Sequence, residues 1–215
     1  MYKRQGQGTI GLEILEQLPD VDVVVVPIGG GGLIAGVAYT IKQINPNCKV
    51  YGVQAAGAPS MKNSVADGKI ETLKNVQTIA DGIAVKTPGT NTFELIKKYV
   101  DGIYTVSDDE IALAILTLME QQKLVSEGAG AVPVAAVMNG KIPDIEGKKV
   151  CCLVSGGNID VTILSRVIER GLKMGGRSAS ITIALSDKPG QLLGVSKIVA
   201  DNGANVVSCL LYTSD

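Results

Sequence analysis

Four consecutive glycines, Gly29 to Gly32, follow an apolar run and constrain the fold more than any other part of this sequence. The run from Asp22 to Ile28 is typical of a strand buried on both faces of a parallel sheet. The segment from Leu33 to Ile44 has a helical pattern that stops before an Asn-Pro-Asn breaker. A strand, a glycine turn and a helix start in this order can bind an anion. The glycines let backbone N–H groups approach it closely, and the helix N-terminus adds the positive end of its dipole.

The composition indicates a folded protein and argues against several classes of function. With 215 residues, of which 46% are hydrophobic and 19% charged, the chain can form one large or two small domains with a buried core. A net charge of −1 without a basic block argues against nucleic acid as the main partner. No apolar run reaches the ~18 residues of a membrane span, so no membrane partner is expected.

Cysteine and histidine usage narrows the chemistry further. Four cysteines without a C-x-x-C pair indicate structural thiols and a cytoplasmic location, rather than a metal or disulfide role. The chain contains no histidine, which excludes Ser-His-Asp triads, Cys-His pairs and histidine metal sites within it. Acid–base chemistry must therefore come from other side chains, a cofactor or a partner segment.

Alternating strand and helix patterns predict an α/β fold, a parallel twisted sheet with flanking helices. Strands are expected at 22–28, 49–54, 102–106 and 149–154, and helices at 9–18, 33–44, 60–67, 90–99, 107–122, 128–138 and 161–172. Ser107 and Glu110 match a capping box at the start of the fifth helix. After a linker at 175–178, the tail is expected to form a second β-α-β unit, with strands at 181–185 and 204–208 around a helix at 191–202.

The glycine loop can be a plain turn, a dinucleotide site or the site of a single monophosphate. A plain turn needs one or two glycines, and four adjacent ones carry an entropic cost. Gly30-x-Gly32-x-x-Ala35 fits a dinucleotide fingerprint, but no acidic residue for the ribose ends the next strand. No Gly-Lys-Ser/Thr follows either, which excludes a nucleotide P-loop. A single monophosphate, as in pyridoxal phosphate, is the interpretation that these residues favour.

A second cluster, Ser155-Gly156-Gly157-Asn158, supports the same interpretation. It also follows a buried strand, so both clusters should lie at the carboxyl edge of the sheet, where ligands bind. The hydroxyl of Ser155 can form a hydrogen bond with one ring nitrogen. Taken alone, the cluster could equally be an ordinary Ser-Gly-Gly turn.

Four motifs resemble the threonine dehydratases in order and spacing. They are VVPIGGGGLIAG at 25–36, Ala-Asp-Gly at 80–82, Glu-Gly-Ala-Gly-Ala at 127–131 and Ser-Gly-Gly-Asn-Ile-Asp at 155–160. This family belongs to the fold-type II pyridoxal-phosphate enzymes, with serine dehydratases and serine racemases. The resemblance runs from about Gly6 to Leu172 and implies a partial tryptophan-synthase-β-like fold.

By this resemblance, eight residues would bind pyridoxal 5′-phosphate (PLP): Gly29, Gly30, Gly31, Gly32, Leu33, Gly82, Glu127 and Ser155. The glycine-loop backbone would hold the phosphate, and Gly82 would line the cofactor. Glu127 would lie near the nitrogen edge of the ring, although taken alone it is a carboxylate at a helix N-terminus. Ser155 would sit at the pyridine nitrogen. A serine there gives a weaker electron sink than a carboxylate, which suits β-elimination.

The tail resembles the start of an ACT domain, a small amino-acid-sensing module, because 187–192 is close to its D-x-P-G-x-L turn. The implied organisation is part of a catalytic domain at 6–174 and a partial ferredoxin-like ACT domain at 179–208. Residues 1–5 and 209–215 leave the family pattern abruptly and are expected to be non-native ends of a fragment. An amino-acid effector at the ACT region and a homo-oligomeric complete protein are further implications.

The resemblance also implies what this chain lacks. The lysine of the family lies in an S-x-K-x-R-G segment, which is absent here, so no catalytic residue is assigned. Some relatives bind a divalent metal at positions that correspond to Gln54, Ala58 and Ser60, a poor set of ligands, so no metal site is expected. The expected function is part of an enzyme of amino-acid metabolism (isoleucine biosynthesis) that converts L-threonine to 2-oxobutanoate and ammonia. A serine racemase and a non-catalytic amino-acid-binding regulatory protein are the alternatives.

Overall fold

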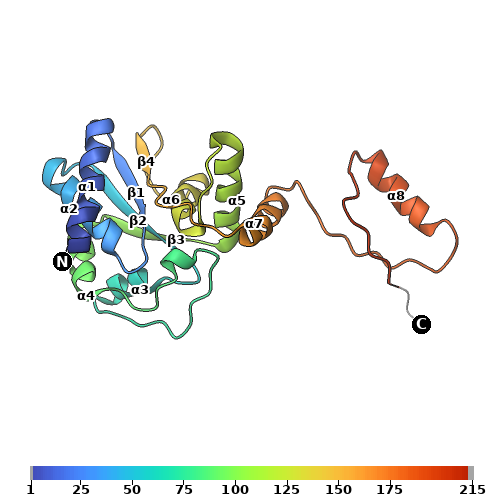
Figure 1. Ribbon diagram of the computed structural model, residues 1–215, viewed down its shortest axis with the longest axis horizontal. Helices are drawn as coiled ribbons and strands as arrows, with labels where there is room; N and C mark the ends of the chain where they lie inside the picture. The colour runs from blue at the N-terminus through green and yellow to red at the C-terminus, as the bar shows by residue number, and fades with distance from the viewer. Residues whose placement is uncertain (1, 213–215) are drawn as a thin grey trace. The chain divides into compact units, whose positions relative to one another are not determined.

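A parallel four-stranded sheet in the order β3-β2-β1-β4 forms the centre of the first part of the chain (Figure 1). The computed structural model describes residues 2–212, with side chains from residue 6 onward. The strands are β1 (Val23–Pro27), β2 (Lys49–Ala55), β3 (Gly102–Val106) and β4 (Val150–Cys152). Val23 of β1 is in register with Lys49 of β2 and with Val150 of β4. The expected α/β fold with a parallel sheet is confirmed.

Helices cover both faces of this sheet (Figure 1). They are α1 (Tyr2–Gln17), α2 (Gly32–Ile44), α3 (Ser60–Asp67), α4 (Thr90–Tyr99), α5 (Asp108–Thr117), α6 (Gly128–Met138) and α7 (Val161–Met174). Strand β1 is buried on both sides because its side chains alternate between two cores. Val23 and Val25 pack with residues of α5, α6 and α7, whereas Val24 and Val26 pack with residues of α1 to α4. The continuous apolar run in the sequence therefore reflects a central strand.

The helix that follows Ser107 shows how local sequence sets an element. The Ser107 hydroxyl accepts a hydrogen bond from the Glu110 N–H at 3.3 Å, and the Glu110 carboxylate accepts one from the Ser107 N–H at 2.7 Å. The predicted capping box is confirmed. The helix is regular only to Thr117, and a π-helical turn (Leu118–Gln122) completes the segment that the sequence predicts as one helix.

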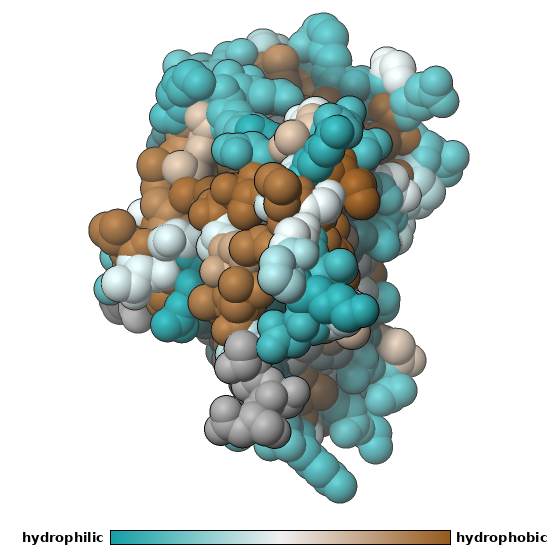
Figure 2. All heavy atoms as spheres, turned by 90° about the vertical axis from the view of Figure 1, so that its right-hand side faces the viewer, coloured by the Kyte–Doolittle hydropathy of each residue, from teal (hydrophilic) through white to brown (hydrophobic). Residues whose placement is uncertain are grey.

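Residues from Ala179 onward form a separate unit, and between Ala179 and residue 212 it contains one helix, α8 (Gln191–Asp201). Gly190, with φ of 88°, adopts the left-handed conformation at its start. The strands expected at 181–185 and 204–208 are not formed among the described residues. In the expected β-α-β unit these two strands would pair with each other, and two strands without a third or a covering layer are marginally stable. Hydrophobic side chains of this unit, such as Leu193 and Ile198, are exposed. Figure 2 shows that hydrophobic side chains reach the surface on the face of the molecule that it presents.

The thiols of the first unit lie in apolar surroundings. Burial raises the pKa of Cys48 to about 11 and that of Cys152 to about 12. All four cysteines are free thiols. Across residues 2–212, no helix is both long and apolar enough to cross a membrane.

Candidate functional site

The candidate site lies at the carboxyl edge of the sheet, between β1 and β4. Strand β2, which follows β1 in the chain, pairs with one edge of β1, whereas β4 pairs with the opposite edge of β1. Ligands of open α/β sheets bind where the strand order reverses in this way. A cavity of about 230 Å³ opens at this point. It is smaller than the ~300–1,000 Å³ of sites that enclose a drug-sized ligand, so these residues form a small or partial site.

All eight residues that the sequence singles out line this one cavity. The lining consists of Gly29, Gly30, Gly31, Gly32, Leu33, Gly82, Glu127 and Ser155, together with Pro27, Ile83 and Ala129. The last three were not among the sequence candidates, although each lies next to, or within two residues of, one of them. The structure thus brings together four segments that are up to 126 positions apart, from Gly29 to Ser155.

The glycine loop has the geometry of an anion cradle. Gly31 has φ of 89° and precedes the first residue of α2. A Cβ added to Gly30 or Gly32 would meet nothing within 4 Å, so the space beside the loop is open. Side chains at these positions would occupy that space. The absence of Cβ atoms therefore leaves room for a group that contacts the backbone itself.

Helix α2 directs unpaired backbone donors toward the same cavity. Its first intrahelical hydrogen bond runs from the Ala35 N–H to the Gly31 carbonyl at 3.0 Å. The N–H groups of Gly32, Leu33 and Ile34 consequently have no partner within the helix. These donors and the positive end of the helix dipole favour an anion at the loop.

The opposite wall is formed by the turn Asp81–Ile83 (η1) and by the start of α6. A Cβ on Gly29 would lie 3.2 Å from the Cα of Ile83, and one on Gly82 would lie 3.1 Å from the Cβ of Ala129. Both are tighter than ordinary contacts. Glycine at these two positions lets the walls approach each other closely.

Glu127 and the segment after β4 are held together by backbone contacts. The Glu127 N–H donates to the Gly156 carbonyl at 3.1 Å, and the Ser126 hydroxyl donates to the same oxygen at 3.3 Å. A Cβ on Gly156 would lie 2.3 Å from a carboxylate oxygen of Glu127, so a larger residue at this position would displace that carboxylate. This pairing places Ser155 in the wall of the cavity, and its side chain is exposed there.

The carboxylate of Glu127 is the ionisable group of the cavity wall. Burial, and secondarily the negative charge of Asp81, raise its pKa above the ordinary value. A raised pKa means that the folded state binds the proton more tightly than the unfolded chain does. The stability linked to this proton is present at low pH and is lost as the pH rises through the folded pKa.

Glu127→Gln is therefore expected to raise the melting temperature slightly at neutral pH, because it removes an unfavourable negative charge. The gain should disappear as the pH falls through the pKa of Glu127, where the wild-type carboxyl is protonated as well. Thermal unfolding of both proteins across this pH range measures the effect. Glu94→Gln, at an exposed position on α4, serves as the control. A difference that grew toward low pH would contradict the assignment.

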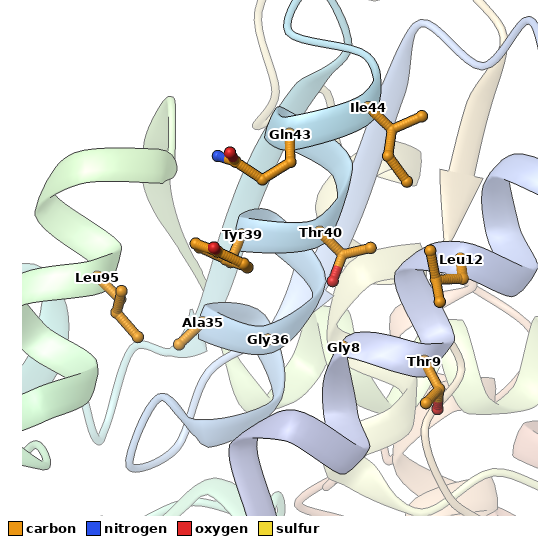
Figure 3. Close-up of a pocket in the computed structure, with 10 residues that line it drawn as sticks. All are labelled: Gly8, Thr9, Leu12, Ala35, Gly36, Tyr39, Thr40, Gln43, Ile44 and Leu95. Carbon is orange, nitrogen blue, oxygen red and sulfur yellow. The ribbon is translucent and has the colours of Figure 1, made fainter.

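A larger groove of about 480 Å³ lies between α1, α2 and α4 (Figure 3). Figure 3 shows its walls, which include Leu12 of α1, Tyr39 of α2 and Leu95 of α4. The described residues that line it include no charged side chain. These lining residues offer an anionic ligand neither a positive charge nor the free N–H groups of a helix start, so the smaller cavity is the candidate site.

The three positions that the sequence resemblance compared with a metal site are Gln54, Ala58 and Ser60. Gln54 is fully buried, and its amide donates to the Ile28 carbonyl at 3.3 Å and accepts from the Lys62 N–H at 2.8 Å. Ala58 and Ser60 are fully buried as well. Among the residues that the structure describes, no three His, Cys, Asp or Glu side chains are grouped to hold a metal ion.

Comparison with known proteins agrees with this geometry. The sequence model of the family described as pyridoxal-phosphate-dependent enzyme matches residues 2–156. The L-threonine ammonia-lyase of Thermotoga maritima is 57% identical over 203 residues, which are 94% of this chain and 50% of that protein. A structure of threonine deaminase isoform 2 from Solanum lycopersicum matches with a TM-score of 0.72 and 41% identity, over 78% of this chain and 49% of that one.

The structure of maize serine racemase is also similar, with a TM-score of 0.71 and 37% identity over 80% of this chain and 54% of that one. The chain spans about half the length of the curated relatives it matches. The family match covers most of the first unit, including the glycine loop and Ser155. This chain therefore belongs to the family of pyridoxal-phosphate-dependent enzymes.

Proposed function

We propose that this chain is the cofactor-anchoring part of an L-threonine ammonia-lyase, which converts L-threonine to 2-oxobutanoate and ammonia. The observation that carries the proposal is the meeting of the glycine loop and Ser155 in one cavity at the strand-order reversal. The relative from Thermotoga maritima bears this activity in its name and is 57% identical to the chain. Residues 6–174 are proposed as the part of the catalytic domain present here.

The residues of the cavity fit PLP in chemistry. The open space beside Gly30 and Gly32, and the free N–H groups at the start of α2, suit a phosphate group. The Ser155 hydroxyl would form a hydrogen bond with the pyridine nitrogen, while Gly82 and Glu127 would border the ring. When bound, PLP supplies the electron sink that stabilises a carbanion at the amino-acid Cα. A hydroxyl partner keeps this sink weaker than a carboxylate would, which favours β-elimination.

No residue of this chain is proposed to move the α-proton. Among these 215 residues, no lysine lies in the S-x-K-x-R-G context of the resembled family. The chain's role is to bind the phosphate, orient the ring and keep the cofactor at the edge of the sheet. The segment that carries the lysine would come from the rest of the complete protein.

A serine racemase is the second candidate function. The observation that favours it is the similarity to the maize serine racemase structure, whose TM-score nearly equals that of the tomato threonine deaminase. The two activities differ in their product. Formation of D-serine rather than 2-oxobutanoate by the complete protein would select the racemase.

The tail at 179–208 is proposed as half of an ACT domain that binds an amino-acid effector in a homo-oligomer. Its support is the Asp187–Leu192 turn, the left-handed Gly190 and the exposed apolar side chains of α8, which a complete domain would cover. Cytoplasm is the proposed compartment, on the pattern of free thiols. Neither nucleic acid nor a membrane is proposed as a partner.

Binding of pyridoxine 5′-phosphate to the purified chain tests the proposed site. This probe carries the ring and the phosphate but lacks the aldehyde that would react with surface lysines. We expect saturable binding that unphosphorylated pyridoxine does not reproduce. Failure to bind, or equal affinity for both compounds, would contradict the phosphate site.

Activity is tested by reconstitution. The chain with PLP alone should release no ammonia from threonine. Mixed with the N-terminal half of the Thermotoga maritima relative, it should form 2-oxobutanoate. Turnover by the chain alone would contradict the assignment of the lysine to another segment. Formation of D-serine when the mixture is supplied with L-serine would favour the second candidate.

A further inference from the structure

Two hydrogen-bond donors that lie far from Gly30 in the sequence bind the carbonyl of Gly30. It accepts a hydrogen bond from the Thr92 hydroxyl at 2.6 Å and another from the Gly89 N–H at 3.2 Å. Both donors belong to the start of α4, about 60 positions after the glycine loop. Thr92 is 8% exposed, so its hydroxyl is largely shielded from water. One carbonyl of the candidate phosphate loop is thus fixed by a buried side chain that does not line the cavity.

This contact determines which way the loop presents its N–H groups. In a trans peptide the C=O and the following N–H point in opposite directions, and the chain has no cis peptide among its described residues. When Thr92 and Gly89 hold the Gly30 carbonyl on the α4 side, the Gly31 N–H must point to the other side. The cavity lies on that side, because its lining includes Gly29 to Gly32 but no residue of α4.

Thr92 also restricts the backbone of Gly31. A Cβ on Gly31 would lie 2.9 Å from the Thr92 hydroxyl oxygen, so this oxygen is packed against the Gly31 Cα. The conformation at φ of 89° is one that an unrestrained loop leaves easily. Thr92 therefore contacts the loop both by hydrogen bonding and by packing.

A simpler role for Thr92 is to close the first turn of α4. Its hydroxyl lies 2.8 Å from the Gly89 carbonyl, three residues earlier, which is a common contact at a helix start. A hydroxyl has one proton to donate, and the shorter distance is the one to Gly30. The two roles predict different results for ligand affinity, because closing the turn of α4 affects folding alone.

We infer that Thr92 is a positioning residue of the phosphate site, which fixes the Gly30 peptide so that the glycine loop presents its N–H groups to a phosphate monoester. The nature of the anion rests on the proposed function, whereas the effect of Thr92 on the loop does not. Thr92 is not among the residues that line the cavity. It acts through the orientation of one peptide group.

The test compares Thr92→Val, which keeps the shape but removes the hydroxyl, with Thr92→Ser, which keeps the hydroxyl. Thr92→Val should weaken binding of pyridoxine 5′-phosphate roughly tenfold, because one buried hydrogen bond is lost and the loop is released. Thr92→Ser should restore most of the affinity. Thr117→Val is the matched control, since the Thr117 hydroxyl donates to the Leu113 carbonyl at 2.9 Å within α5. It should leave the affinity unchanged.

A second readout is independent of any ligand. Amide hydrogen exchange at Gly31 and Gly32, measured by NMR, should become faster in Thr92→Val and stay the same in Thr92→Ser and Thr117→Val. Equal affinity and equal exchange in Thr92→Val and wild type would overturn the inference while the proposed function stands. If the wild type failed to bind the probe, the proposed function would fail, and the exchange rates would still decide the role of Thr92.

Discussion

Replacing Gly31 by alanine is expected to weaken binding of pyridoxine 5′-phosphate by at least ~100-fold. The φ of 89° costs an L-residue about 1–2 kcal/mol. The added Cβ would also lie 2.8 Å from terminal carbons of Ile96 and Met61 and 2.9 Å from the Thr92 oxygen, an overpacking of about 1–3 kcal/mol. Rotation of the peptide that Thr92 holds would relieve both the strain and the contact with Thr92. Since each ~1.4 kcal/mol is tenfold in affinity, this rearrangement accounts for the expected loss.

Gly68→Ala is the matched control for backbone strain. Gly68 has φ of 72° at the end of α3, and a Cβ there would meet nothing within 4 Å. This variant should lose about 1 kcal/mol of stability and keep its affinity. Fluorescence titration measures the affinity, and circular dichroism confirms that both variants are folded. Wild-type affinity in Gly31→Ala would show that the loop does not bind the phosphate through its backbone.

The sequence predicts the place of the candidate site because it lies at the ends of parallel strands. An apolar strand followed by glycines recurs at β1 and β4, and adjacent parallel strands bring such segments to one edge. Gly82 and Glu127 were found only through motifs of a resembled family, since neither follows a strand. Their arrival at the cavity depends on the packing of η1 against Gly29 and of α6 against Gly82.

Two features of the structure could not be predicted from the pattern of residues along the sequence. Thr92 is an ordinary helix-start residue in the sequence, and only the fold brings its hydroxyl to Gly30. The segments 181–185 and 204–208 have the apolar pattern of strands but form none, because two strands alone are marginally stable without further neighbours. The periodicity of a sequence indicates which face of a segment could be buried. Whether the segment forms a strand also depends on neighbouring elements that pair with it and cover that face.

Replacing Ile34 by alanine is expected to lower the free energy of unfolding by about 2–5 kcal/mol, the range for deleting a fully buried isoleucine side chain. Ile34 is inaccessible to solvent and lies on α2, three residues after Gly31. Its Cδ1 would lie 2.9 Å from a Cβ on Gly52, so it packs on β2 where glycine leaves room for it. The side chain thus anchors the start of α2 to the sheet. Its loss leaves a cavity beneath the helix end that faces the candidate site.

Ile44→Ala on the same helix is the control for a change in helix propensity, because the same substitution is made there at a residue that is 58% exposed. Its effect should stay within about 0.5 kcal/mol. Urea denaturation of both variants measures the difference, which should appear as a lower midpoint for Ile34→Ala. Equal midpoints would contradict the anchoring role. Because the N–H donors of Gly32 and Leu33 belong to the turn that Ile34 anchors, folded Ile34→Ala should also bind pyridoxine 5′-phosphate more weakly than folded Ile44→Ala.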